Sequence, residues 1–166
     1  MTMNDVSDIA CNDQGFDVAV DLGPGWRIDA GAEPSMDAWL DKAKKDPAAA
    51  EVGMYLTHNG VVRATPRMAV RGATSDERAE GESLGEVASI DFSYDTDGLI
   101  DAVKAARELP GVHYIRVWLN EGTLKVGESL MYVLIGADIR PHAVDALQTL
   151  VGKIKNDLVV EHENYE

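Results

Sequence analysis

Two segments with strong strand character lie close together near the C-terminal end of the chain, and an amphipathic helix follows them. Residues His113 to Leu119 and Leu130 to Ile135 are rich in β-branched, aromatic and aliphatic side chains, and a glycine-containing link joins them. A helix is expected from about Pro141 to Asn156, because proline suits a first helical position. Its expected buried stripe is Val144, Leu147, Val151 and Ile154. This order requires a sheet with a helix packed on it.

The preceding part of the chain also shows the apolar periodicities of helices and of strands. A helix capped by Ser35 is expected to end before Pro47, and a second one spans Leu99 to Leu109. A strand over residues 52–57 should turn or bend at Gly60, and another should cover residues 87–94. Residues 72–85 have the composition of an exposed, mobile loop. The predicted fold class is α+β, a hammerhead-like sandwich with helices packed on a largely antiparallel sheet.

The chain is long enough for one well-buried core and too short for two ordinary domains. It has 166 residues, of which 45% are hydrophobic. Residues 1–34 are rich in Gly, Asp and Pro, and only Phe16 to Val20 alternates like a strand. The expected division is therefore an N-terminal extension of unknown role over 1–34 and one domain over 35–166.

The charge of the chain excludes one broad class of partner. A formal net charge of −14 disfavours nucleic acid, since affinity for phosphate backbones depends on clustered Lys and Arg. Any anionic ligand must therefore be held by a local group of cations. The acidic residues are spread along the chain, and this pattern fits solubility about as well as recognition of a basic partner.

Cysteine, histidine and apolar runs give no sign of a metal or a membrane. Cys11 is the single cysteine, so an internal disulfide and a cysteine metal site are both excluded. The four histidines have no metal-ligand spacing, and neither a metal nor another cofactor is expected. No apolar run approaches the roughly 18 residues of a membrane span. A cytoplasmic location is expected.

Three features of the sequence together resemble a known family. They are the segment Gly60-Val61-Val62-Arg63, the link Gly122-Thr123-Leu124-Lys125-Val126-Gly127-Glu128, and Arg140 followed fifteen residues later by Lys155. None of them would suffice alone. Their order and content resemble the MoaE family, the catalytic (large) subunit of molybdopterin synthase, over roughly residues 35 to 163. The chain looks like a divergent member.

The resemblance implies a function, partners and a site. The family's enzyme is a sulfurtransferase of molybdenum cofactor biosynthesis, converting cyclic pyranopterin monophosphate into the dithiolene of molybdopterin. The sulfur comes from the thiocarboxylated tail of a small ubiquitin-like sulfur-carrier subunit (MoaD-like), and the large subunit forms a homodimer. By this resemblance Lys155 would be catalytic, and Arg63 and Arg140 would bind the pterin phosphate substrate.

The residue types suit these roles. Arginine presents a planar fork of donors to phosphate, and the helix N-terminus at Arg140 adds free N–H groups. A lysine away from water has a lowered pKa and can act as a nucleophile or proton carrier, or, when charged, stabilise an oxyanion. Fifteen helical residues separate Arg140 and Lys155 by roughly 22 Å. If both act on one small molecule, Arg140 must come from the second chain of a dimer.

The sequence departs from the family pattern at polar positions. Ile139 stands where a histidine is usual, and Val159-Val160-Glu161-His162 stands where a second lysine is usual. His162 is the candidate to replace that lysine in part, as a substrate-binding residue. Two alternatives to the enzyme therefore stay open: a non-catalytic paralogue that is a pterin- or partner-binding dimeric module, and a dimeric scaffold without a ligand.

Overall fold

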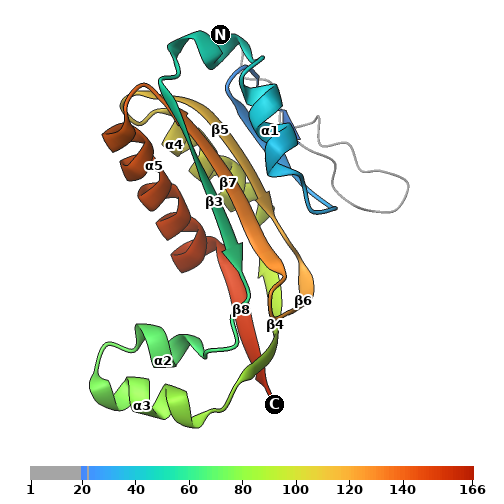
Figure 1. The fold of residues 1–166 in the computed structure, drawn as a ribbon, viewed down its shortest axis with the longest axis vertical. Helices are drawn as coiled ribbons and strands as arrows, with labels where there is room; N and C mark the ends of the chain where they lie inside the picture. Colours follow the sequence, from blue (N-terminus) through green and yellow to red (C-terminus); the bar gives the residue numbers. More distant parts are fainter. Residues whose placement is uncertain (1–19, 22) are drawn as a thin grey trace.

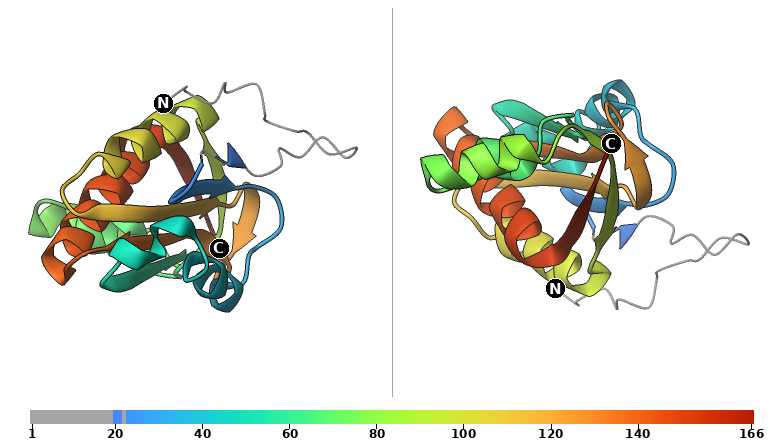
Figure 2. Two further views of the ribbon diagram at one scale, coloured as in Figure 1. Left: turned by 90° about the horizontal axis from the view of Figure 1, so that it is seen from above. Right: turned by 90° about the horizontal axis from the view of Figure 1, so that it is seen from below.

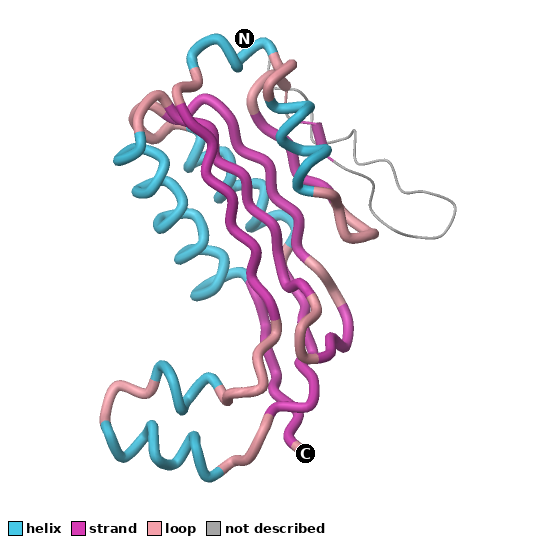
Figure 3. The backbone as a smooth tube through the Cα atoms, viewed as in Figure 1, coloured by secondary structure: helices cyan, strands magenta, loops and turns pink. Residues whose placement is uncertain are grey.

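The computed structural model describes residues 20, 21 and 23–166, which form two sheets (Figures 1 and 3). The larger sheet has the strand order β1 (Val20–Asp21), β2 (Trp26–Asp29), β5 (Val112–Leu119), β7 (Ser129–Ala137) and β3 (Met54–Val61). The smaller sheet has the order β6 (Gly122–Lys125), β4 (Val87–Tyr94) and β8 (Val159–Tyr165). Within the described residues, β2 with β5 is the one parallel pair. The predicted α+β class with a largely antiparallel sheet is confirmed.

Helices cover both faces of the larger sheet. The helix α4 (Thr96–Arg107) and the helix α5 (Arg140–Lys153) lie side by side on one face, and α1 (Met36–Ala43) lies on the other (Figure 2). The short helix η2 (Pro47–Glu51) follows α1, and a π-helical turn, η3 (Ile154–Leu158), follows α5. The hairpin of α2 (Arg67–Arg71) and α3 (Ser75–Ser83) stands away from the larger sheet, beside the C-terminal strand (Figure 1).

The two strands predicted most strongly are buried on both faces. Along β5, Ile115 and Val117 face α4 and α5, while Tyr114 and Trp118 face α1. Because side chains alternate along a strand, both sets are removed from water only when helices cover both faces. All of β7 except Tyr132 is buried in the same way. These two strands form the centre of the fold.

Several expectations for local structure were wrong. Residues 75–83 form the helix α3 where a loop was expected, because the Thr74 hydroxyl accepts from the Glu77 N–H and the Glu77 carboxylate accepts in return. Of the turn or bend expected at Gly60, the turn is absent, because β3 runs through to Val61; the strand is irregular there, with a register shift between Gly60 and Val61. The most buried positions of α5 are Ala143, Ala146 and Leu150, one residue before Val144, Leu147 and Val151 of the expected stripe. The fourth expected position, Ile154, is fully buried, and Leu147 and Val151 are partly buried against the core.

Part of the segment before residue 35 belongs to the larger sheet. The strand β2 pairs with β5, and the Asp29 carboxylate accepts hydrogen bonds from Arg116 of β5 at 2.6 Å and from the Trp39 indole of α1 at 2.9 Å. Asp29 therefore joins three elements. Most of the strand suggested at residues 16–20 lies outside the described residues, and the domain boundary at residue 34 stays a prediction.

None of the helices in the described ranges is long and apolar enough to cross a membrane.

Candidate functional site

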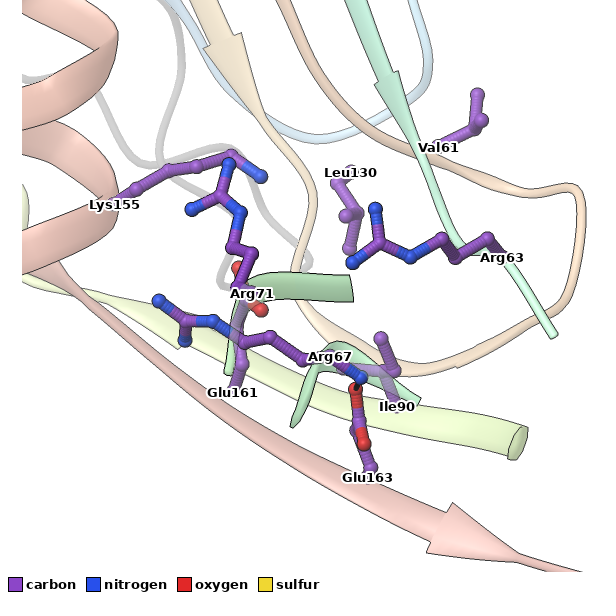
Figure 4. Close-up of a pocket in the computed structure, with 9 residues that line it drawn as sticks. All are labelled: Val61, Arg63, Arg67, Arg71, Ile90, Leu130, Lys155, Glu161 and Glu163. Carbon is purple, nitrogen blue, oxygen red and sulfur yellow. Dashed lines mark hydrogen bonds between the residues drawn. The ribbon is translucent and has the colours of Figure 1, made fainter. Parts of the chain in front are cut away.

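A pocket lies where the end of β3, the hairpin of α2 and α3, the turn η3 and the smaller sheet meet (Figure 4). We call it the junction pocket. Its lining residues are Val61, Arg63, Arg67, Arg71, Ile90, Leu130, Lys155, Glu161 and Glu163. The pocket has a volume of about 50 Å³, whereas typical small-molecule sites have about 300–1,000 Å³. Further groups must therefore complete it around any ligand larger than a small ion.

Two of the sequence motifs meet at this pocket. The Val62 N–H donates to the Glu128 carbonyl at 2.9 Å, and the Gly127 N–H donates to the Val62 carbonyl at 2.8 Å. Gly127 has a φ of +89°, which favours glycine. Because Val62 precedes Arg63, the glycine-containing link fixes the backbone from which Arg63 enters the pocket. The two motifs are therefore joined by backbone hydrogen bonds beside the pocket.

Lys155 lies in the π-helical turn η3, an irregular form that occurs frequently at functional sites. Burial lowers the pKa of its amine below the ordinary 10.5, with Glu161 opposing the shift and Arg71, Arg67 and Arg63 adding to it. Within the described part of the chain, the amine has no hydrogen-bond or ion-pair partner. The structure thus presents a half-buried amine, free of close partners, beside three guanidinium groups.

His58 is a neighbour of Lys155 on β3. Burial, and after it the charge of Lys155, lower the pKa of the imidazole below 6.5. Its Nε2 atom is buried and lacks a hydrogen-bond partner among the residues described. A buried polar atom without a partner costs free energy and is often retained at functional sites. His58 therefore belongs to the surroundings of the Lys155 amine.

The structure brings together some of the predicted site residues. Arg63 and Lys155 line the same pocket. Arg140 is exposed at the opposite end of α5 and does not line the junction pocket. His162 is exposed and lies opposite Asp91 in the smaller sheet. Since Glu161 and Glu163 line the pocket, the intervening His162 points to the other face of β8, and its role as a substrate-binding residue stays a prediction.

Four polar residues of the junction pocket were not predicted from the sequence as site residues. Arg67 and Arg71 are four residues apart and follow Pro66, so they lie on one face of a helical turn. Glu161 and Glu163 are two apart on a strand and so share a face. The spacing of both pairs is visible in the sequence. Residues 72–85 were expected to form a loop, so the helical hairpin that positions the two arginines was not predicted.

The fold is that of the large subunits of molybdopterin synthase. The molybdopterin biosynthesis MoaE protein from Burkholderia ambifaria MC40-6 matches with a TM-score of 0.59 and 14% identity, covering 86% of each chain. The molybdopterin synthase structure from Staphylococcus aureus matches with a TM-score of 0.52 and 15% identity, covering 70% of this chain and 77% of that one.

A third match is a structure of two subunits together. It is the protein–protein complex of subunits 1 and 2 of molybdopterin-converting factor from Helicobacter pylori 26695, with a TM-score of 0.52 and 13% identity. The match covers 78% of this chain and 78% of that one. No protein-family model and no curated protein matches this sequence. At these identities the likeness concerns the fold, and at that level it confirms the resemblance drawn from the motifs.

The lowered pKa of Lys155 predicts how the stability depends on pH. Between the folded pKa and 10.5 the unfolded chain binds more protons at this residue, so the free energy of unfolding rises with pH across that window. Below the window the buried charge destabilises the folded state throughout. Lys155→Met should therefore raise the free energy of unfolding at neutral pH and lose this pH dependence. Denaturant unfolding at several pH values measures both effects.

Lys153→Met is the matched control, because Lys153 is exposed and forms an ion pair with Asp157 at 2.7 Å. It should not raise the free energy of unfolding at neutral pH. A Lys155→Met variant less stable than wild type at neutral pH would contradict the buried-charge account.

Proposed function

We propose that this protein is the large subunit of a molybdopterin synthase, transferring sulfur from a thiocarboxylated small subunit to cyclic pyranopterin monophosphate. The observation that carries the proposal is the Lys155 amine, half-buried with a lowered pKa beside Arg63, Arg67 and Arg71. The fold shared with molybdopterin synthase large subunits supports it. In this proposal the activity is that of a sulfurtransferase.

The proposed roles follow from the chemistry of the side chains. A neutral Lys155 amine can attack the thiocarboxylate carbon, forming a C–N bond as the C–S bond breaks and the sulfur leaves as hydrosulfide toward the pterin, or it can carry a proton. The charged form can stabilise the oxyanion that develops at that carbon. A lowered pKa increases the neutral fraction at neutral pH. Arg63 is in place to bind an anionic group of the pterin at the same pocket.

The partner we propose is a small ubiquitin-like subunit whose C-terminal tail reaches Lys155. The Helicobacter pylori structure, which contains two subunits of molybdopterin-converting factor, supports such a partner. The small volume of the junction pocket also requires further groups around a pterin. We propose that Arg140 of a second copy of this chain supplies one of them, since α5 keeps Arg140 and Lys155 of one chain apart.

A second candidate is a non-catalytic module that binds a pterin or a partner on the same fold. Glu161 and Glu163 favour it, because these carboxylates reduce the positive field around Lys155. The absence of the family's second lysine, whose place is taken by Val159 to His162, points the same way. In this candidate the pocket binds its ligand and no sulfur is transferred.

The shared site of the proposed dimer predicts complementation between variants. Lys155→Ala and Arg140→Ala should each strongly reduce conversion of the cyclic pterin to molybdopterin when assayed alone with a thiocarboxylated small subunit. After unfolding and refolding together in equal amounts, about a quarter of the sites should hold both native residues, because half of the dimers are mixed. Activity should return to about that fraction.

Mixing each variant with itself through the same refolding is the control. Full activity of a strictly monomeric protein, or no recovery in the mixed sample, contradicts the shared site.

A further inference from the structure

The helix α2 carries two arginines that face the junction pocket. Arg67 and Arg71 are four residues apart, and both line the pocket. Like charges at this spacing destabilise a helix. A helix of five residues also has little stability of its own. The pair therefore sits on an element that the rest of the fold must support.

The helix α3 supplies that support. Gly81 of α3 packs so closely on α2 that a Cβ atom there would lie 2.3 Å from the Ala69 nitrogen. The Thr74 and Glu77 capping box starts α3, and the Arg78 guanidinium donates to the Gly72 carbonyl at 2.8 Å. A carboxylate oxygen of Glu163 accepts a hydrogen bond from the backbone N–H of Arg67 at 2.7 Å and so joins the hairpin to β8. These contacts hold α2 beside the pocket.

The guanidinium groups of Arg67 and Arg71 are left without a close counter-ion. Within residues 23–166, neither forms a hydrogen bond or an ion pair, although Glu161 and Glu163 also line the pocket. Figure 4 shows the Arg71 guanidinium beside the end of the Lys155 side chain. The pocket holds four cationic side chains and two carboxylates, so its formal charge with Lys155 protonated is 4 − 2 = +2. In a chain of net charge −14, this is a local excess of positive charge.

We propose that α2 is an anion-binding arm, in which Arg67 and Arg71 hold a phosphate group of the ligand against Lys155. The proposal rests on the proposed function, because it assigns further binding residues to the same pocket. Phosphate offers several acceptor oxygens and up to two negative charges, which match two guanidinium forks and a pocket charge of +2. A carboxylate offers two oxygens and one charge. The arm therefore selects phosphate over the carboxylate end of a peptide.

The test is calorimetric titration of the full-length protein with inorganic phosphate, and separately with acetate as the carboxylate probe. Charge-assisted hydrogen bonds are roughly twice as strong as neutral ones. Arg67→Ala/Arg71→Ala should therefore weaken phosphate binding by about 10-fold or more. Acetate should bind more weakly than phosphate to the wild-type protein. Lys44→Ala/Lys104→Ala removes two positive charges outside the pocket and should leave the phosphate affinity unchanged.

Arg67→Lys/Arg71→Lys keeps both charges but loses the planar forks, and it covers the case in which the alanine variant does not fold. It should bind phosphate with an affinity between those of wild type and the double alanine variant. Equal phosphate affinity in wild type and both arginine variants overturns the proposal, as does acetate binding as tight as phosphate binding, or no phosphate binding by the wild type.

The proposed function and the anion-binding arm fail in different ways. Arginine-dependent phosphate binding without any sulfur transfer supports the anion-binding arm and contradicts the proposed sulfurtransferase activity. If Arg67→Ala/Arg71→Ala transfers sulfur at the wild-type rate and with the wild-type KM, the result supports the sulfurtransferase activity and contradicts the anion-binding arm.

Discussion

Lys155→Ala is expected to lower the rate of sulfur transfer by about 10²–10⁴-fold, the usual effect of losing one group that moves a proton in the transition state. The amine is half-buried in the junction pocket and has no hydrogen-bond or ion-pair partner among the described residues. Binding of the small subunit should change little, because only the end of one side chain is removed. Single-turnover conversion of the cyclic pterin with a thiocarboxylated small subunit measures the rate.

Lys153→Ala is the matched control for this variant. Lys153 lies two residues away, is exposed and pairs with Asp157, so its removal should leave the rate close to that of wild type. A wild-type rate in Lys155→Ala would contradict the catalytic role of Lys155. An equally slow Lys153→Ala would contradict it as well.

Asp29→Ala is expected to lower the free energy of unfolding by about 3–5 kcal/mol, the cost of leaving a buried charge without its partner. Arg116 is 4% exposed, and its guanidinium donates two hydrogen bonds to the Asp29 carboxylate, at 2.6 and 3.0 Å. The guanidinium also lies 4.9 Å from the centre of the Trp39 ring. Without Asp29, the Arg116 guanidinium loses the carboxylate with which it pairs and stays buried between β5 and α1. Denaturant unfolding measures the change.

Two further variants test this explanation. Asp41→Ala breaks an exposed ion pair with Lys45 and should change stability little. Asp29→Ala/Arg116→Met removes both charges and should recover part of the loss, because a hydrophobic pair avoids the cost of burying a charge. A double variant less stable than Asp29→Ala alone would show that the stabilisation does not depend on pairing the charge of Arg116.

Long elements with clear periodicity were predictable from the sequence. The helix α1 was expected with its Ser35 cap, and the strands β5 and β7 with nearly their observed bounds. Short strands were not predictable, because β2 and β6 form only through pairing with distant segments. The helix α3 was missed because its composition is polar, although Thr74 and Glu77 give the capping-box spacing.

The candidate site was predictable where it depends on motifs and hidden where it depends on packing. Arg63 and Lys155 were predicted from separate motifs, and the structure places both in one pocket. Arg67 and Arg71 enter that pocket only because α3 braces α2, a contact that no local pattern shows. The alternation along β8 that turns His162 away also depends on which face the sheet presents to the pocket.

The most direct test of the central proposal is to incubate the wild-type protein with a thiocarboxylated small subunit and cyclic pyranopterin monophosphate, and to identify the pterin product by mass spectrometry. The proposal predicts a product that carries sulfur from the small subunit, formed only when all three components are present. Binding of the small subunit or the pterin without incorporation of sulfur would contradict the enzyme and favour the non-catalytic module on the same fold.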